Sequence, residues 1–431
     1  MTSLPVDDSP AERLDLARVA RRITLTLFSA QSLGSAGFLA AATINAIVGA
    51  RLSGHLAWAG MPTAIYQGGA AVAAFAWGHL MDRLGRRWTL ALGTLCGVLG
   101  AATASVAVTR GSFVAFLGGL LFMGCANSAL QLGRFVAAEV HPPLERGRAI
   151  SYVVLGGTVG ALFGPALVGP AGRFAVGHGM DELAGPYAGS ALLFAFVVGV
   201  LVFGLRPEPR EVAREVAARY PVTGSGLRSH RPLLEIFRDP GVVVAVGTMV
   251  SAQVVMVMLM VITSLHMTNH HHPLTSVSLV ISSHVVGMYA FSLVSGRLAD
   301  DWGRAPVIVS GAVVLVGACL AAPLSPNLLP VSLALFLLGL GWNFCYVGGS
   351  SLLADRLAPT ERARTQGSND FLIGLVSALG SLGSGVIFAA SGYATMSLVG
   401  AAVALLPLGL GLWWRGRGGP SGLEWPHSIG H

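Results

Sequence analysis

The stretch that decides the fold is Gly78–Arg87, which reads GHLMDRLGRR and follows a long apolar segment. A related stretch, GRLADDWGR at Gly296–Arg304, follows another long apolar segment in the second half of the chain. Both copies hold a glycine, an acidic residue, a second glycine and an arginine at one spacing. Because the same motif ends two apolar segments, the sequence predicts two homologous halves.

The composition requires a bilayer, since 53% of the residues are hydrophobic and only 11% are charged. Crossing about 30 Å of hydrocarbon takes roughly 20 apolar residues. Single charge-free runs of that length fill the first half, and longer runs in the second half are interrupted by prolines or polar residues. The runs of the first half are 23–50, 88–109, 111–133, 149–172 and 183–205. We therefore expect an all-α membrane protein with twelve helices, six in each half.

The basic residues predict the orientation. All 27 of them are arginines, and among the loops expected outside only Arg51, Arg110 and Arg173 are basic. The positive-inside rule then places both termini in the cytoplasm. The net charge of +7 reflects this topology and the lipid headgroups, not nucleic acid. The first 22 residues are polar and lack the apolar core of a cleavable signal peptide.

The same pattern predicts five regions. They are a cytoplasmic segment 1–22, a first bundle 23–205, a linker 206–239, a second bundle 240–414 and a cytoplasmic tail 415–431. The linker carries a short charged helical stretch, which we interpret as a solvated connection without chemistry.

A second repeat makes a resemblance specific. Ala138–Arg148 reads AEVHPPLERGR and Ala354–Arg364 reads ADRLAPTERAR, so an acidic residue, a proline and an Arg-x-Arg recur in register. With the motif at Gly78 and Gly296, this resembles the major facilitator superfamily over roughly residues 20 to 415. The resemblance implies the fold of that superfamily, with two six-helix bundles related by a pseudo-twofold axis along the membrane normal. It also implies transport and no enzymatic activity.

The resemblance further implies a cytoplasmic charge network that holds the outward-facing state. The gating residues are then Asp82, Arg83, Arg86, Glu139, Arg146, Asp300, Arg304, Asp355 and Arg362. Ion pairs at the membrane surface can open at modest cost as the halves rock. The alternative is that the arginines only enforce topology. The second copy has Asp301 and Ala305 where the first has Arg83 and Arg87, so we expect a weaker network there.

The run 149–172 holds glycines four residues apart at Gly156, Gly160 and Gly164. It resembles the helix-5 signature of drug and proton antiporters in the superfamily and favours export. The alternative is close helix packing without an export role. Leu120 stands where those antiporters carry a basic residue.

A substrate site needs polar groups near the bilayer centre on helices that line the cavity. The repeat superimposes Asn127 on Asn343 and Tyr66 on His284, which favours these pairs. The predicted substrate-binding residues are Gln31, Tyr66, Asn127, Gln131, Gln253, His284, Trp342, Asn343 and Tyr346. The alternative is that the Asn and Gln side chains only bridge helices.

Asp370 is the one carboxylate well inside an apolar run, and it is the candidate for proton coupling. The alternative is an interhelical hydrogen-bond partner. The histidines at His266 and His270–His272 suggest a metal, but consecutive histidines on a loop cannot all reach one ion, so we predict no metal site and no cofactor.

The sequence thus predicts a monomeric secondary active transporter of the plasma membrane, of the bacterial inner-membrane type. A neutral, aromatic-lined cavity suits a small neutral or amphipathic organic solute. Export coupled to proton entry is the first hypothesis. Uptake of a sugar-like or heterocyclic nutrient is the second, and a receptor that binds without transport is the third.

Overall fold

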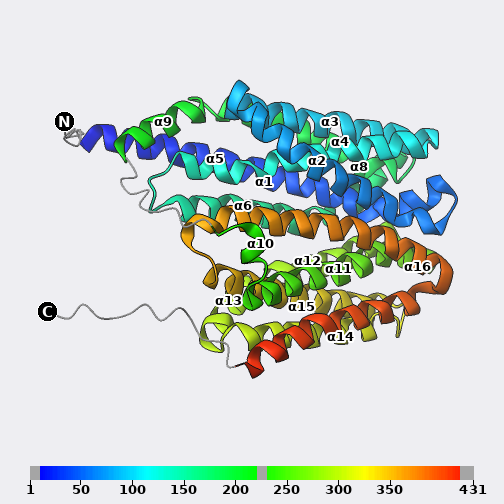
Figure 1. Cartoon of the computed structure of the whole chain (residues 1–431). Helices are drawn as coiled ribbons and strands as arrows, with labels where there is room; N and C mark the ends of the chain where they lie inside the picture. The colour runs from blue at the N-terminus through cyan, green and yellow to red at the C-terminus, as the bar shows by residue number, and fades with distance from the viewer. Residues whose placement is uncertain (1–9, 221–230, 418–431) are drawn as a thin grey trace. The chain divides into compact units, whose positions relative to one another are not determined.

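The computed structural model describes residues 10–220 and 231–417, and every regular element in these ranges is a helix. The chain divides into two compact units (Figure 1). Among the described residues, the first unit comprises 10–220 and His272–Ser278, and the second comprises 231–271 and 279–417.

The helices of the first unit follow one another with short connections. They are α1 (Pro10–Ser53), η1 (Leu56–Gly60), α2 (Met61–Leu84), α3 (Arg86–Arg110), α4 (Phe113–Gln131), α5 (Gly133–Glu139), α6 (Arg146–Phe163), η2 (Pro165–Leu167), α7 (Val168–Gly177), α8 (Ala184–Gly204) and α9 (Pro209–Arg219).

The second unit repeats this pattern. Its helices are α10 (Leu233–Ile236), α11 (Pro240–Asn269), α12 (Leu274–Tyr289), α13 (Ser292–Asp301), α14 (Arg304–Ala321), α15 (Leu328–Asp355) and α16 (Pro359–Gly416).

These helices account for the twelve predicted crossings. Ten helical stretches in the described ranges are long and apolar enough to span a membrane. The last of them, Arg364–Gly416, turns back at Gly392, where a φ of 78° breaks the helix, and so makes two crossings (Figure 1). Helix α2 has 24 residues but is not one of these ten stretches, and counting it gives the twelve crossings expected from the sequence. The chain is therefore a multi-pass membrane protein.

In the first unit α1 packs against α6 and α8. The glycines of α6 allow this close approach, because a Cβ added at Gly160 would lie 1.8 Å from the carbonyl oxygen of Ser32. Gly156 and Gly164 meet Phe28 and Ala36, one turn to either side. The glycines spaced four residues apart in the sequence thus allow α6 to pack closely against α1.

Buried polar side chains also join α1 to α8. The hydroxyl of Tyr187 donates to Oδ1 of Asn45 at 2.8 Å, and the hydroxyl of Ser190 donates to the carbonyl oxygen of Gly37 at 2.8 Å. In the second unit α11 takes the corresponding place and packs against α15 and α16.

The segment after α8 is not simply a solvated connection, as the sequence had suggested. Val212 and Val216 of α9 are buried against the first unit. A carboxylate oxygen of Glu208 accepts hydrogen bonds from the backbone amides of Arg86 and Arg87, at 2.6 and 3.3 Å. Because the first amides of a helix have no partner within it, Glu208 caps α3 and anchors this segment.

Candidate functional site

The clearest cluster of predicted substrate residues lies within the second unit. Gln253 of α11 is 8% exposed and uses both ends of its amide. Its Oε1 accepts a hydrogen bond from Nε1 of Trp342 at 2.9 Å, and its Nε2 donates to the hydroxyl of Ser377 at 3.0 Å. One residue therefore joins three helices, α11, α15 and α16, around an indole ring.

Aromatic rings extend this cluster. Trp342 stacks on Tyr346, with ring centroids 4.7 Å apart and an interplanar angle of 21°. Tyr289, at the end of α12, meets the edge of Trp342 at 6.5 Å. Sequence reasoning missed Tyr289 and Ser377. The position of Tyr289 in the same apolar run as His284 was the available signal for the tyrosine.

The side chain of Asn343 forms hydrogen bonds at the break between α12 and α13. Its Nδ2 donates to the carbonyl oxygen of Met288 at 2.6 Å and to the hydroxyl of Ser292 at 2.9 Å. Its Oδ1 accepts from the hydroxyl of Ser295 at 2.7 Å. Since a continuous helix would itself satisfy the Met288 carbonyl, Asn343 replaces a lost backbone bond. These contacts favour the helix-bridging interpretation of Asn343.

His284 of α12 is fully buried against α15. Its Nδ1 lies 2.9 Å from the carbonyl oxygen of Leu335, which makes Nδ1 the protonated nitrogen. Its Nε2 has no partner within the described part of the chain.

The predicted residues of the first unit are placed differently. The half-buried Tyr66 meets Phe38 edge-on, with ring centroids 6.0 Å apart. Helices α2 and α4 cross at Tyr66 and Gly124, one turn before Asn127. Asn127 is half-buried and makes no side-chain hydrogen bond to the residues the structure describes. Asn127 thus differs from Asn343, whose side-chain amide is fully hydrogen-bonded within the second unit.

The two glutamines of the first unit are less central. Gln31 is 6% exposed, and its Nε2 lies 3.4 Å from the hydroxyl of Ser35. Gln131 is the last residue of α4 and is exposed.

The charge network forms within each unit. Arg86 binds Glu139 through two bonds, Nε to Oε2 at 2.9 Å and Nη2 to Oε1 at 3.2 Å. Its Nη1 also donates to the carbonyl oxygen of Met81 and, at 3.4 Å, to Asp82.

Arg304 repeats this arrangement in the second unit. Its Nε donates to Oδ2 of Asp355 at 3.0 Å, and its Nη1 donates to Asp300 at 2.7 Å and to the carbonyl oxygen of Ala299. The four acids and two arginines predicted for these positions are therefore brought together in two matching clusters.

The motif glycines explain why this geometry recurs. Gly85 has φ 87° and ψ 172°, and Gly303 has φ 90° and ψ 166°. A positive φ of this kind strains any residue with a Cβ. Each glycine turns the chain sharply between two helices and brings the following arginine back toward the acid.

Three predicted gating arginines lie outside these clusters. Arg83 is exposed and makes no side-chain hydrogen bond to the described residues. Arg146 donates to the carbonyl oxygen of His141 at 3.4 Å, and Arg362 donates to that of Ala354 at 3.3 Å. Both therefore bind backbone rather than a carboxylate.

A third ion pair was missed by sequence reasoning. Arg231 binds Glu361 through two bonds of 3.0 and 2.8 Å and also donates to the carbonyl oxygen of Arg356. Glu361 is 2% exposed and accepts from the backbone amide of Ala358. The Arg231 guanidinium lowers the pKa of this carboxyl to about 2. Glu361 stands directly before Arg362 in the repeated motif, which was the available signal.

Asp370 lies on α16, where Nε2 of Gln366 donates to its Oδ1 at 2.9 Å. The carboxylate is half-buried. The structure thus places Asp370 next to a neutral amide one turn away on its own helix.

The predicted absence of a metal site concerns the histidines near His266. In the described residues no group of three or more His, Cys, Asp or Glu side chains is placed to hold a metal ion. His266 instead stacks on Tyr393, with ring centroids 4.1 Å apart.

At the end of α1, Arg51 forms a two-bond ion pair with Asp181. The Arg51 guanidinium lowers the pKa of the Asp181 carboxyl.

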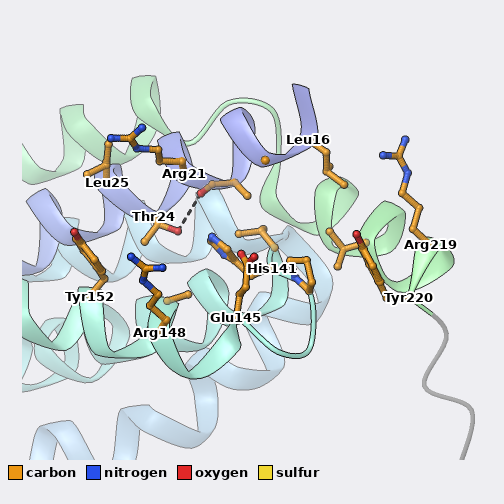
Figure 2. A pocket seen from close by; sticks show the side chains of 16 residues that line it. Leu16, Arg21, Thr24, Leu25, His141, Glu145, Arg148, Tyr152, Arg219 and Tyr220 are labelled. Atoms are coloured by element: carbon orange, nitrogen blue, oxygen red, sulfur yellow. Dashed lines mark hydrogen bonds between the residues drawn. The ribbon is translucent and has the colours of Figure 1, made fainter. Parts of the chain in front are cut away.

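A pocket of about 480 Å³ with polar and apolar walls lies in the first unit between α1, the α5–α6 connection, α6 and α9. Figure 2 shows Thr24, His141, Arg148 and Tyr152 directed into the space between α1 and α6. Arg21 and Glu145 also line it. The pocket mixes cations, one carboxylate and apolar side chains, and it offers no paired groups for covalent chemistry.

Comparison with known proteins decides the family. The model of the Major Facilitator Superfamily matches residues 23–268 and 244–424, which is nearly the whole chain. The chain belongs to the Major Facilitator Superfamily. It is a transporter of this family rather than an enzyme, and the resemblance inferred from the repeated motifs is confirmed.

Relatives within the Major Facilitator Superfamily cover the chain almost completely. The uncharacterized MFS-type transporter YdeG of Bacillus subtilis is 35% identical over 400 residues, which covers 92% of this chain and 93% of YdeG. The riboflavin transporter RfnT of Brucella anthropi is 30% identical over 381 residues, 88% of this chain and 92% of RfnT. The crystal structure of the nucleoside transporter NupG matches with a TM-score of 0.69 and 16% identity over 93% of this chain and 100% of NupG, which confirms the fold.

Proposed function

We propose that this protein moves a small, planar, neutral or amphipathic organic compound across the plasma membrane by alternating access. The observation that carries the proposal is the Gln253–Trp342–Tyr346 cluster. It offers a stacked pair of rings and no charged group.

The cluster suits a flat ring for two reasons. The hydrogen bond to Gln253 fixes the orientation of the Trp342 indole, so little side-chain freedom is lost when a ligand binds. Stacked or edge-on aromatic contacts each contribute about 0.5–1.5 kcal/mol beyond the area they bury. A phosphate or a polycarboxylate would instead require inward-facing cations.

The relative RfnT supports the same class of substrate. It is a riboflavin transporter, and riboflavin is a flat heterocycle joined to a polar chain. This is our reason for putting flavins and similar heterocycles first among the compounds to be tested.

For the direction of transport, export coupled to proton entry is the first proposal, because of the glycine spacing of α6. Uptake is the second proposal, and two observations are compatible with it. The α6 glycines are accounted for by packing against α1, and Leu120 is fully buried in the apolar core where the antiporters carry a basic residue.

We also propose that both termini lie in the cytoplasm and that Asp370 exchanges the coupling proton. The arginine distribution supports the orientation. Asp370 is the only charged residue between Arg364 and Arg415 of α16, which supports coupling. A receptor without transport activity is the remaining alternative, and flux measurements distinguish it.

The test uses full-length protein in liposomes with riboflavin, a purine nucleoside and a hexose as candidate solutes. We expect the two heterocycles, and not the hexose, to raise the thermal stability and to cross the membrane. A pH gradient of either sign then identifies export or uptake. Trp342→Ala should abolish the stabilisation by heterocycles, while Trp302→Phe, a change at an exposed loop residue, should preserve it. Selective stabilisation by the hexose, or equal stabilisation of the Trp342→Ala variant, would contradict the proposal.

A further inference from the structure

A second hollow of the first unit runs along α1 and α8 and has a volume of about 1020 Å³. Its walls change character along α1. Arg18, Arg21 and Arg22 line one end, and Leu25, Phe28 and Leu33 follow along the helix. None of the described residues that line it is acidic. This hollow, called the groove below, is therefore cationic at the arginine end, which we call the head. It is apolar along the rest of α1, which we call the shaft.

The far wall is apolar and open to the surroundings. Phe196, Val200 and Phe203 lie on one face of α8, three and four residues apart. Phe196 is 63% exposed and Phe203 is 70% exposed, so these rings are not covered by the unit itself. Val159 of α6 also lines the shaft.

The hydroxyl groups in the shaft do not make it polar. Thr26 donates to the carbonyl oxygen of Arg22, Ser29 to that of Leu25 and Ser32 to that of Phe28. The hydroxyl of Thr26 also lies 3.5 Å from the carbonyl oxygen of Gly204 on α8. Because each hydroxyl is satisfied by backbone carbonyls, the shaft presents carbon surface to a bound chain.

The dimensions match one leaflet of a bilayer. A helix rises 1.5 Å per residue, so the distance along α1 from Arg22 to Leu33 is about 16 Å. Half of a hydrocarbon core of about 30 Å is about 15 Å. A lipid with its phosphate at Arg22 would therefore have its acyl chain end near Leu33.

Two of the arginines at the head, Arg21 and Arg22, are open to a ligand. Arg21 and Arg22 are exposed and form no ion pair with any side chain that the structure describes. Basic pockets between membrane helices on the cytoplasmic side attract anionic headgroups.

We propose that this groove is a binding site for an anionic phospholipid, with the phosphate held by Arg21 and Arg22 and an acyl chain along the Leu25–Leu33 face of α1 and the Phe196–Phe203 face of α8. The proposal concerns lipid binding and is independent of the transported compound.

The test is native mass spectrometry of the delipidated full-length protein with equal amounts of dioleoyl phosphatidylglycerol and dioleoyl phosphatidylcholine. Each arginine near a phosphate changes binding by about fivefold. We expect the wild type to retain phosphatidylglycerol at least tenfold more strongly than phosphatidylcholine. Arg22→Gln should reduce this preference about fivefold, and Arg21→Gln with Arg22→Gln should abolish it.

Two further variants keep the result specific. Arg210→Gln with Arg214→Gln removes the same charge from α9, outside the groove, and should leave the preference unchanged. Val200→Trp keeps both arginines but fills the shaft, and it should weaken the binding of phosphatidylglycerol. The proposal is overturned if the wild type does not prefer phosphatidylglycerol, or if the double groove variant retains the preference. It is also overturned if inorganic phosphate displaces the lipid and Val200→Trp has no effect, since the site would then bind a free anion.

Discussion

Nε of Arg86 donates to Oε2 of Glu139 at 2.9 Å and so joins the start of α3 to the end of α5. Arg304 and Asp355 make the matching bond in the second unit. The side chains of both acids are about one-third exposed, so these pairs lie where water can reach them. An ion pair in such a place can open and close at low cost, which a gate requires.

Glu139→Gln tests this gate. The change removes the charge but keeps the size of the side chain, and the fold should lose only about 1 kcal/mol. The melting temperature should then fall by about 2–4 °C. Transport should fall about tenfold, because a loss of 1–2 kcal/mol in one state shifts the conformational equilibrium by that factor. Solute flux into liposomes measures the effect, with Arg83→Gln as the control. Equal flux in both variants would mean that the arginines only set the topology.

The pair of Arg231 with Glu361 predicts a pH dependence of stability. The pKa of Glu361 is about 2 in the folded protein, below the value of about 4.3 in an unfolded chain. The ionised carboxylate therefore stabilises the fold above pH 4.3, and this contribution is lost as the pH falls toward 2. Thermal unfolding in detergent between pH 6 and pH 3 should show a steeper loss for the wild type than for Glu361→Gln.

Glu211→Gln, at an exposed position of α9, is the control for that measurement. It should follow the wild-type curve. Parallel curves for the wild type and Glu361→Gln would show that this ion pair does not contribute to stability.

Much of the fold could be predicted because bilayers impose simple rules. The length of apolar runs gave the spans, and the motifs at Gly85 and Gly303 gave the two halves. The break at Gly392 also lies in the Ser391–Tyr393 stretch that interrupts the last apolar run. The docking of α9 was not predicted, although Val212 and Val216 lie four residues apart and so share one face of the helix.

The candidate site was less predictable, because register does not determine the partner of a side chain. The repeat superimposes Asn127 on Asn343 in sequence. Only Asn343 is hydrogen-bonded to the break between α12 and α13, where its Nδ2 donates to the hydroxyl of Ser292. Gln253 and Trp342 were both singled out, but their mutual hydrogen bond depends on the helix rotation, which the sequence leaves open.

Asn343 and Asn127 should respond differently to replacement by alanine. Asn343→Ala leaves the Met288 carbonyl without its partner, so the fold should lose about 1–2 kcal/mol. Asn127→Ala breaks no described hydrogen bond and should leave stability nearly unchanged while it lowers the affinity for the solute. Thermal unfolding and solute titration of both variants provide the comparison. If Asn127→Ala destabilised the protein as much as Asn343→Ala, the two residues would share a structural role.

Gly160→Ala should damage the first unit. Its Cβ would overlap the carbonyl oxygen of Ser32, and backbone atoms cannot move aside without separating α6 from α1. Overpacking of this kind costs about 1–3 kcal/mol. Gly147, near the start of the same helix, has open space where a Cβ would lie, so Gly147→Ala is the matched control. The yield of folded protein and its melting temperature measure the difference, and a stable Gly160→Ala variant would mean that the two helices can move apart freely.

Asp370→Asn separates proton coupling from binding. A carboxylate on a membrane helix can take up and release a proton, whereas an amide of the same shape cannot. We expect the variant to bind the solute with wild-type affinity and to equilibrate it down its own gradient, but to lose accumulation driven by a pH gradient. Gln366→Ala removes the amide that donates to Oδ1 of Asp370 and leaves the carboxylate in place, so pH-driven flux should persist. Unchanged pH-driven flux in Asp370→Asn would assign the proton to another group, and loss of binding would make Asp370 part of the solute site.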